Sequence, residues 1–294
     1  MAARSISDRR TRRGRLAPAA VLIALLALPA LGKPLSNAWS EVQGPTHGMT
    51  HIYGGYAAGC IAGAVALPLD GIGYQVIRVS RNRFWGHPAT IRFVQALGRK
   101  VAAAGLPPLY IGDMGQPRGG PLAYGHASHQ IGLDVDIWDT LAPKPALTPK
   151  QREDVPLPEL VTPDQTRIDE RHWDPRFVEV LRMAAESSEV ERIFVHWQIK
   201  KRLCQTVKGD RRWLAKIRAW YGHTEHFHVR LYCPAGSPDC VRQAPLPAND
   251  GCGEELAWWF NVVQKQVSGK PEPEQTKSPN PKLPEQCFKV LRGP

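Results

Sequence analysis

Half of the histidines in this sequence lie in two short stretches whose spacing is suited to holding a metal ion. The first runs from Gly125 to Asp136 and reads GHASHQIGLDVD, with an aspartate seven residues after its second histidine. The second runs from His223 to Leu231 and reads HTEHFHVRL. Histidine nitrogens and carboxylate oxygens are typical ligands of catalytic zinc, whereas structural zinc sites are usually cysteine-rich. We therefore interpret the two stretches as halves of one metal centre.

The first stretch combines a turn with a strand. Its small residues are typical of a turn, and the alternation of apolar and acidic residues from Leu133 to Trp138 predicts a strand. Side chains alternate across a strand, so Asp134 and Asp136 share one face and the apolar residues share the other. A buried carboxylate pair needs compensation, which a divalent cation with histidine ligands supplies.

The second stretch completes the ligand set. His226 and His228 are two residues apart, so a strand places both rings on one side. We predict that the metal ligands are His129, Asp136 and His228. Three such ligands with a vacant fourth position are the form of a catalytic zinc site, which polarises a peptide carbonyl and lowers the pKa of a bound water to about 7. The simpler interpretation, ordinary surface or core histidines, does not account for their clustering beside carboxylates.

Hydrolysis at such a site also requires a general base that passes a proton to the leaving amine. His226 is the first candidate, because it shares the predicted strand face with His228. His223 is the second candidate. Glu225 faces the opposite side of a regular strand, which makes it the weakest of the three. A serine mechanism is disfavoured, because no GxSxG pattern surrounds Ser128.

The surrounding elements predict an α+β fold, with a central antiparallel sheet that carries the zinc site and helices packed against it. One helix is expected to begin at Pro88 and a second at Pro175, because proline is favoured at the first helical position. A third is expected over residues 210–220. Strands are expected at residues 109–111 and 192–195.

The loop at residues 112–120 is rich in glycine and lies just before the first histidines, so we expect it to form one wall of the cleft. Its Arg118 either binds a substrate carboxylate through its planar fork or is simply solvated. Residues 139–168 are polar and proline-rich and are interpreted as an irregular excursion. Four of the five remaining histidines are interpreted as exposed or structural: His47, His51, His87 and His196.

The N-terminus is typical of a secretory signal peptide, which we place at residues 1–32. It has six arginines and one aspartate, then a short apolar run and small residues. The run is short for a membrane span, although an uncleaved anchor is the alternative. Cleavage would remove a formal charge of +5 and leave +6 of the original +11. A basic exported protein suits an anionic polymer such as the cell wall, and no basic helix or aromatic-basic stripe suggests nucleic acid.

We divide the rest of the chain into three parts by composition. Residues 33–58 are predicted to form an extended arm, residues 59–268 the folded domain, and residues 269–294 a proline-rich tail. The six cysteines suggest disulfides in an exported chain and allow 15 pairings. Cys233 and Cys240 are the best local pair, because they flank a short segment rich in proline and glycine.

The motifs of this chain resemble those of the penicillin-insensitive murein endopeptidases, within the wider lysostaphin, D-Ala-D-Ala-carboxypeptidase and hedgehog-type zinc group. The similarity is carried by HASHQIGLDVD and HTEHFHVRL. It extends from about Gly59 to Phe260 through GCIAGAVALP, YQVIR, RFWGHP, YIGDMGQPRGG, RIFV, HFHVRLYCP and NDGCGEEL. The resemblance implies a periplasmic zinc enzyme that cleaves the D-alanyl to meso-diaminopimelyl cross-link of peptidoglycan.

The resemblance also implies roles for individual residues. It marks His223 as an active-site residue and pairs Cys60 with Cys287 and Cys204 with Cys252. It implies a second zinc, for which the matching residues are His126, Asp169 and His172. Hydrogen-bonding support of the main site is the alternative role for these three residues.

Two other functions stay open at this point. A D,D-carboxypeptidase or dipeptidase would keep the same chemistry and change the substrate. A non-catalytic wall-binding protein would keep the zinc for structure alone. The presence of His223 and His226 beside a complete ligand set favours the enzyme.

Overall fold

A seven-stranded sheet forms the centre of the computed structural model, which describes residues 37–141, 145–267 and 282–294. The α+β class is confirmed, with a mixed sheet in place of a purely antiparallel one: β10 pairs parallel with β9, and β5 with β7. In spatial order the strands are β10 (Ile217–Ala219), β9 (Val190–Val195), β11 (His226–Leu231), β8 (Asp134–Trp138), β7 (Leu109–Ile111), β5 (Tyr74–Val76) and β4 (Asp70–Gly71).

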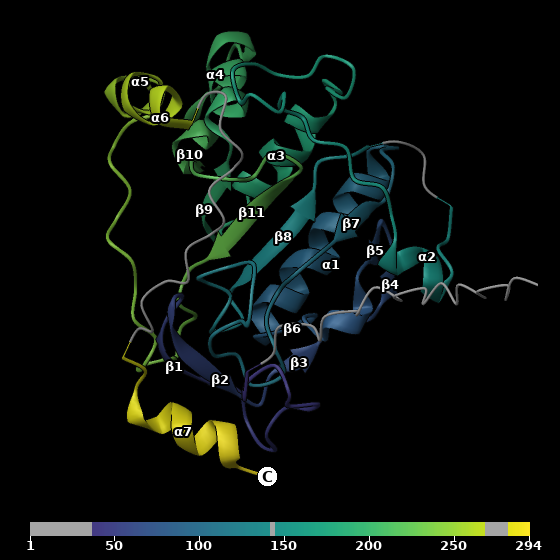
Figure 1. Cartoon of the computed structure of the whole chain (residues 1–294), viewed down its shortest axis with the longest axis vertical. Coiled ribbons are helices and arrows are strands. Elements are labelled where there is room, and N and C mark those ends of the chain that lie inside the picture. Colours follow the sequence, from purple (N-terminus) through teal and green to yellow (C-terminus); the bar gives the residue numbers. More distant parts are fainter. Residues whose placement is uncertain (1–36, 142–144, 268–281) are drawn as a thin grey trace, which may run out of the picture. The chain divides into compact units, whose positions relative to one another are not determined.

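The two strands that carry the histidine and aspartate motifs lie next to each other in this sheet. Strands β8 and β11 are antiparallel, with Asp136 opposite His228 and Trp138 opposite His226 (Figure 1). The apolar residues of β8, among them Val135 and Ile137, are fully buried in the core. The alternation in the sequence therefore predicts both the strand and the face that carries the carboxylates.

Helices α1 (Pro88–Ala103) and α3 (Phe177–Ala185) pack together in the core. The helix predicted at Pro88 is confirmed, and the His87 ring accepts a hydrogen bond from the backbone N–H of Ala89, 3.1 Å away. The helix after Pro175 is confirmed as α3. Helix α4 (Trp197–Thr206) directly follows β9 and was not predicted.

The helix predicted over residues 210–220 is wrong. The segment forms a short 3₁₀ turn, η2 (Arg212–Lys216), and then strand β10. Parallel pairing with β9 satisfies the backbone hydrogen-bonding groups of β10. This tertiary contact outweighs the preference for a helix that the spacing of the apolar residues suggests. Trp213 and Leu214 are buried, whereas Trp220 is 51% exposed.

Several small elements surround the sheet. The excursion at residues 139–168 contains α2 (Pro149–Glu153), and residues 79–81 form η1 (Val79–Arg81). Strands β3 (Val65–Ala66) and β6 (Trp85–Gly86) pair separately. Beyond the sheet follow α5 (Glu254–Trp258), the π-helical η3 (Trp259–Gln264) and α6 (Lys265–Val267).

The ends of the described chain are more ordered than an arm and a tail. Strand β1 (His51–Gly55) forms a hairpin with β2 (Ala58–Ala62), and helix α7 (Glu285–Arg292) contacts β2 (Figure 1). The six cysteines form three disulfides, Cys60–Cys287, Cys204–Cys252 and Cys233–Cys240, which confirms all three expected pairs.

The interpretation of Arg118 as a substrate-binding or solvated residue is wrong. Its guanidinium donates to the carbonyls of Val290, Leu291 and Gly293 at the C-terminus of α7, and to that of Gly44. The segment interpreted as a signal peptide lies outside the described residues. In the described part of the chain, no helix has the length and apolarity that a bilayer crossing requires.

Candidate metal centre

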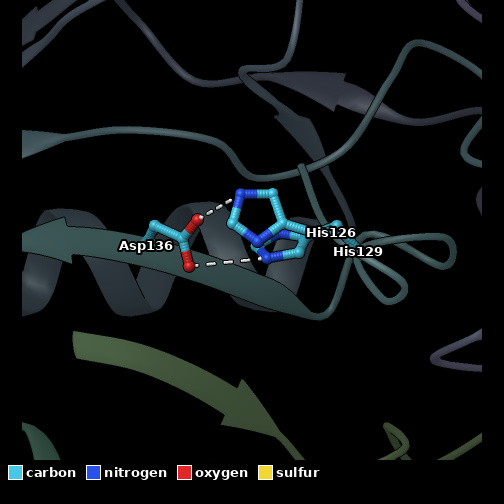
Figure 2. Close-up of side chains that lie close together, drawn as sticks. All are labelled: His126, His129 and Asp136. Carbon is cyan, nitrogen blue, oxygen red and sulfur yellow. Dashed lines mark ion pairs between the residues drawn. The ribbon is translucent and has the colours of Figure 1, made fainter. Parts of the chain in front are cut away.

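The Asp136 carboxylate is the point on which four histidines converge. Its Oδ1 lies 3.4 Å from His129 Nε2, 3.5 Å from His228 Nδ1 and 3.7 Å from His226 Nε2. Its Oδ2 lies 3.2 Å from His126 Nε2. Figure 2 shows the rings of His126 and His129 pointing at the two oxygens. Burial opposes ionisation here, but the surrounding histidines outweigh it and hold the pKa of Asp136 well below its usual range.

The His129 ring is held so that one nitrogen faces Asp136. Its Nδ1 donates to the carbonyl of Met114, 2.6 Å away, and Nε2 is the nitrogen directed at the carboxylate. The backbone of His129 has φ 67°, a left-handed conformation that is uncommon outside glycine. Asp134 supports it by accepting the His129 backbone N–H at 2.9 Å. A strained backbone conformation of this kind is retained at sites where several surrounding contacts hold it in place.

The His228 ring is held in the opposite way. Its Nε2 donates to Asp134 Oδ1 at 2.9 Å, so its unprotonated Nδ1 faces Asp136. Burial lowers the pKa of His228 to about 4 against the opposing pull of Asp134, and the ring is therefore neutral near pH 7. Both predicted histidine ligands thus direct their second ring nitrogen toward the same carboxylate.

Asp134 has a second buried partner, Arg230. The guanidinium donates to Asp134 through Nε at 2.7 Å and Nη2 at 3.3 Å. It lies between the rings of Tyr56 and Phe194, with Cζ 4.3 Å and 5.1 Å from their centroids. The sequence analysis predicted that Asp134 lies on the face of the metal ligands but assigned it no function, and it did not identify Arg230. The period-two spacing of Arg230 after His228 is the signal that could have found it.

The unpaired atoms at this point fit a metal ion. His129 Nε2 and Asp136 Oδ1 are buried, and neither has a hydrogen-bond partner among the described residues. The donor atoms of His126, His129 and Asp136 all lie within 4.8 Å of one another. Two imidazole nitrogens and a carboxylate are the donor set that zinc prefers. A cation here would remove the cost of leaving these buried groups unpaired.

His126 lies within this cluster, but the other two residues predicted for a second zinc lie elsewhere in the structure. His126 Nε2 is 3.5 Å from Asp113 Oδ2, in addition to its contact with Asp136. Asp169 and His172 are 3.7 Å apart and line a different cavity. Asp169 is also paired with Arg171. The assignment of a second zinc to His126, Asp169 and His172 stays a prediction.

The other two candidates for proton transfer, Glu225 and His223, lie beside His226. Its Nδ1 lies 3.6 Å from Glu225 Oε1, so Glu225 turns toward this ring and not away from it as a regular strand predicts. Burial disfavours the charged ring, but Asp136 and Glu225 outweigh it and raise the pKa of His226 to about 9. His223 lies 5.0 Å from His226 between ring centroids, and burial holds its pKa well below the usual value.

Two cavities meet at these histidines. A smaller one of about 190 Å³ is lined by Arg78, Asp136, Trp138, Glu225 and His226, among others. A larger one of about 720 Å³ is lined by Phe194, Trp220, Tyr221, Arg192 and His228, among others. His126, Gly222 and His223 line both. The metal centre is therefore open on two sides.

The chain matches known proteins over most of its length. The family model described as penicillin-insensitive murein endopeptidase matches residues 52–292. A penicillin-insensitive murein endopeptidase of Haemophilus influenzae is 43% identical over 278 residues, which cover 93% of this chain and 94% of the relative. Proteins with the same description from Klebsiella pneumoniae strain 342 and Escherichia coli O1:K1 are 43% and 42% identical, over 92% of this chain and 97% and 96% of the relatives. The chain therefore belongs to the penicillin-insensitive murein endopeptidase family.

Proposed function

We propose that this protein is a zinc-dependent endopeptidase that hydrolyses D-alanyl to meso-diaminopimelyl cross-links in peptidoglycan. The observation that carries the proposal is the arrangement of His129 and His228. Each ring has one nitrogen tied by a hydrogen bond and the other directed at Asp136. We assign His129, Asp136 and His228 as the ligands of the catalytic zinc. The names of the relatives, which describe murein endopeptidases, support the substrate class.

A zinc ion held by these ligands would polarise the scissile carbonyl and provide a hydroxide nucleophile near neutral pH. His226 and His223 lie on the open side of the ligand set and line the cavity where the peptide would lie. We assign to them the proton transfers to and from the reacting groups, with Glu225 acting on His226 through their 3.6 Å contact. Asp134 and Met114 keep the ligand histidines in the tautomer that metal binding requires.

The two cavities favour an endopeptidase over a carboxypeptidase. An endopeptidase must hold chain on both sides of the scissile bond, and the metal centre opens into space on both sides. The larger cavity has room for a branched peptide, and its aromatic side chains offer apolar surface. The basic net charge and the N-terminal sequence support export to the periplasm, where the cross-links are found.

The proposal is tested with purified cross-linked muropeptide dimers and zinc-loaded protein. Dimers should be converted to monomers, chelation should stop the reaction, and added zinc should restore it. Asp136→Ala should abolish both zinc binding and cleavage. Asp210→Ala should change neither, because Asp210 is exposed and lines neither of the two cavities at the candidate site. Release of terminal D-alanine with intact dimers would instead favour the carboxypeptidase. Unchanged cleavage after removal of all zinc would refute the mechanism.

A further inference from the structure

The 3₁₀ turn η1 is bounded by two residues in the left-handed conformation, Arg78 with φ 55° and Asn82 with φ 51°. Neither is glycine, so the turn holds strain that its surroundings must maintain. The Arg78 backbone N–H donates to the carbonyl of Arg152 in α2 at 2.8 Å, and Ser80 Oγ donates to Glu153 at 2.5 Å. The excursion that contains α2 therefore holds this turn in place.

The turn directs the Arg78 side chain over Trp138, with Cζ 4.5 Å from the ring centroid. Trp138 follows Asp136 by two residues on β8, so the stacked guanidinium lies on the same face of the strand as the metal ligands. The indole ring also packs against His226, with 5.3 Å between ring centroids. Arg78 thus reaches the wall of the 190 Å³ cavity beside the proposed reacting groups.

Arg78 differs from its neighbouring arginines in its contacts. Arg81 and Arg83 both pair with Asp113, at 3.2 Å and 2.7 Å. The Arg78 guanidinium has no hydrogen-bond acceptor or ion pair among the residues that the structure describes. Burial and the nearby Arg81 lower the pKa of Arg78, against the opposing attraction of the Asp113 and Glu225 carboxylates. A half-buried cation held flat by a ring, with its N–H groups unpaired, is prepared to bind an anion.

We propose that Arg78 binds a free carboxylate of the substrate next to the scissile amide. This inference rests on the proposed function. In a D-alanyl to meso-diaminopimelyl cross-link, the carbon attached to the amide nitrogen also bears a free carboxylate. A substrate whose amide lies over the metal ligands would place that carboxylate in the smaller cavity. A planar guanidinium donates two parallel hydrogen bonds to it, which fixes the amine side of the substrate.

The test compares two synthetic muropeptide dimers that differ only in this carboxylate, which is free in one and amidated in the other. Wild-type protein should cleave the free form with a kcat/KM roughly 10- to 100-fold higher, as expected for a charge-assisted hydrogen bond. Arg78→Asn removes the guanidinium and suits the left-handed backbone, because asparagine tolerates positive φ. It should lower kcat/KM for the free form by the same factor and leave the amidated form nearly unchanged. Arg92→Ala, at an exposed arginine of α1, should keep the wild-type ratio.

Arg78→Lys separates charge from geometry. It should recover only part of the preference, because an ammonium group lacks the planar fork. An equal loss on both dimers in Arg78→Asn, or no wild-type preference, would overturn the proposal. Failure of the wild type to cleave either dimer would count against the proposed function alone. For that case, calorimetric titration of the two diaminopimelate-containing monomers, one with the free carboxylate and one with the amide, tests Arg78 without catalysis. Arg78→Asn should weaken binding only of the monomer with the free carboxylate. Equal binding of both monomers by wild-type protein would contradict the inference.

Discussion

Asp134 Oδ1 accepts a hydrogen bond from His228 Nε2 at 2.9 Å, and this contact determines which nitrogen of His228 is free to bind a metal. The same carboxylate holds the His129 backbone and pairs with Arg230. One buried side chain thus contacts both of the histidines that we propose as zinc ligands, and it lines neither of the two cavities beside them.

We predict that Asp134→Asn weakens zinc binding roughly 10- to 100-fold, the usual effect of losing a carboxylate that orients a histidine ligand. Zinc affinity is measured by competition with a chelator, below the unfolding temperature. The variant is also expected to unfold more easily, because Arg230 loses its buried counter-charge. Asp239→Asn is the matched control, since Asp239 pairs with His51 at 2.7 Å on the surface and should leave zinc binding unchanged. Wild-type affinity in Asp134→Asn would contradict this role.

His226→Ala is expected to keep zinc and to lose activity by roughly 10²- to 10⁴-fold, the range for a general acid–base residue. Glu225→Ala should cost less, because Glu225 contacts the site through the His226 ring. Turnover of cross-linked muropeptides and zinc content are measured for both variants. A much larger loss in Glu225→Ala, with zinc retained in both, would make Glu225 the principal group.

A second zinc at His126, Asp169 and His172 should bind more weakly than the first. Asp169 is already paired with Arg171, and His172 Nδ1 donates to the carbonyl of Glu159 at 2.9 Å. Metal binding by these two residues therefore requires that both contacts be broken. Zinc titration with metal analysis should show two classes of site, and His172→Ala should remove only the weaker. One zinc per chain at saturation, unchanged in His172→Ala, would mean that these residues do not bind metal.

His196 should make the protein less stable as the pH falls. It is fully buried at the start of α4, where its Nδ1 accepts the Gln198 N–H, and burial lowers its pKa from 6.5 to about 3. Below pH 6.5 the unfolded chain binds a proton that the folded chain excludes, so stability decreases between pH 6.5 and 3. The loss is about 2 kcal/mol at pH 5. Asparagine is also a good N-cap, so His196→Asn should show a shallower decrease in denaturant unfolding, and an unchanged slope would contradict the assignment.

Local patterns predicted the parts of the fold that depend on local interactions. The alternation after Leu133 predicted β8 and the face of Asp136, and the proline at position 88 predicted the start of α1. The helix expected at residues 210–220 was wrong because pairing of β10 with β9, a contact between distant segments, decided its structure. Arg118 was misinterpreted for the same reason, because three of its four acceptors lie more than 170 residues away.

The candidate site divides in the same way. Residue type and spacing sufficed to predict which side chains share a strand face, as for His226 and His228. They did not show that the Arg78 guanidinium forms no ion pair with any described residue, because that depends on the pairing of Asp113 with Arg81 and Arg83. The turn of Glu225 toward His226 likewise comes from the loop before β11, whose His223 is in the left-handed conformation.

The contacts of Arg118 also have a consequence for the order of events during folding. The glycine-rich loop next to the proposed metal centre obtains part of its support from the carbonyls of Leu291 and Gly293, and Cys60 from Cys287. These partners are separated from the loop and from Cys60 by more than 170 residues of sequence. The loop therefore cannot reach its final conformation through local contacts alone, and it is completed only after α7 has docked against β2.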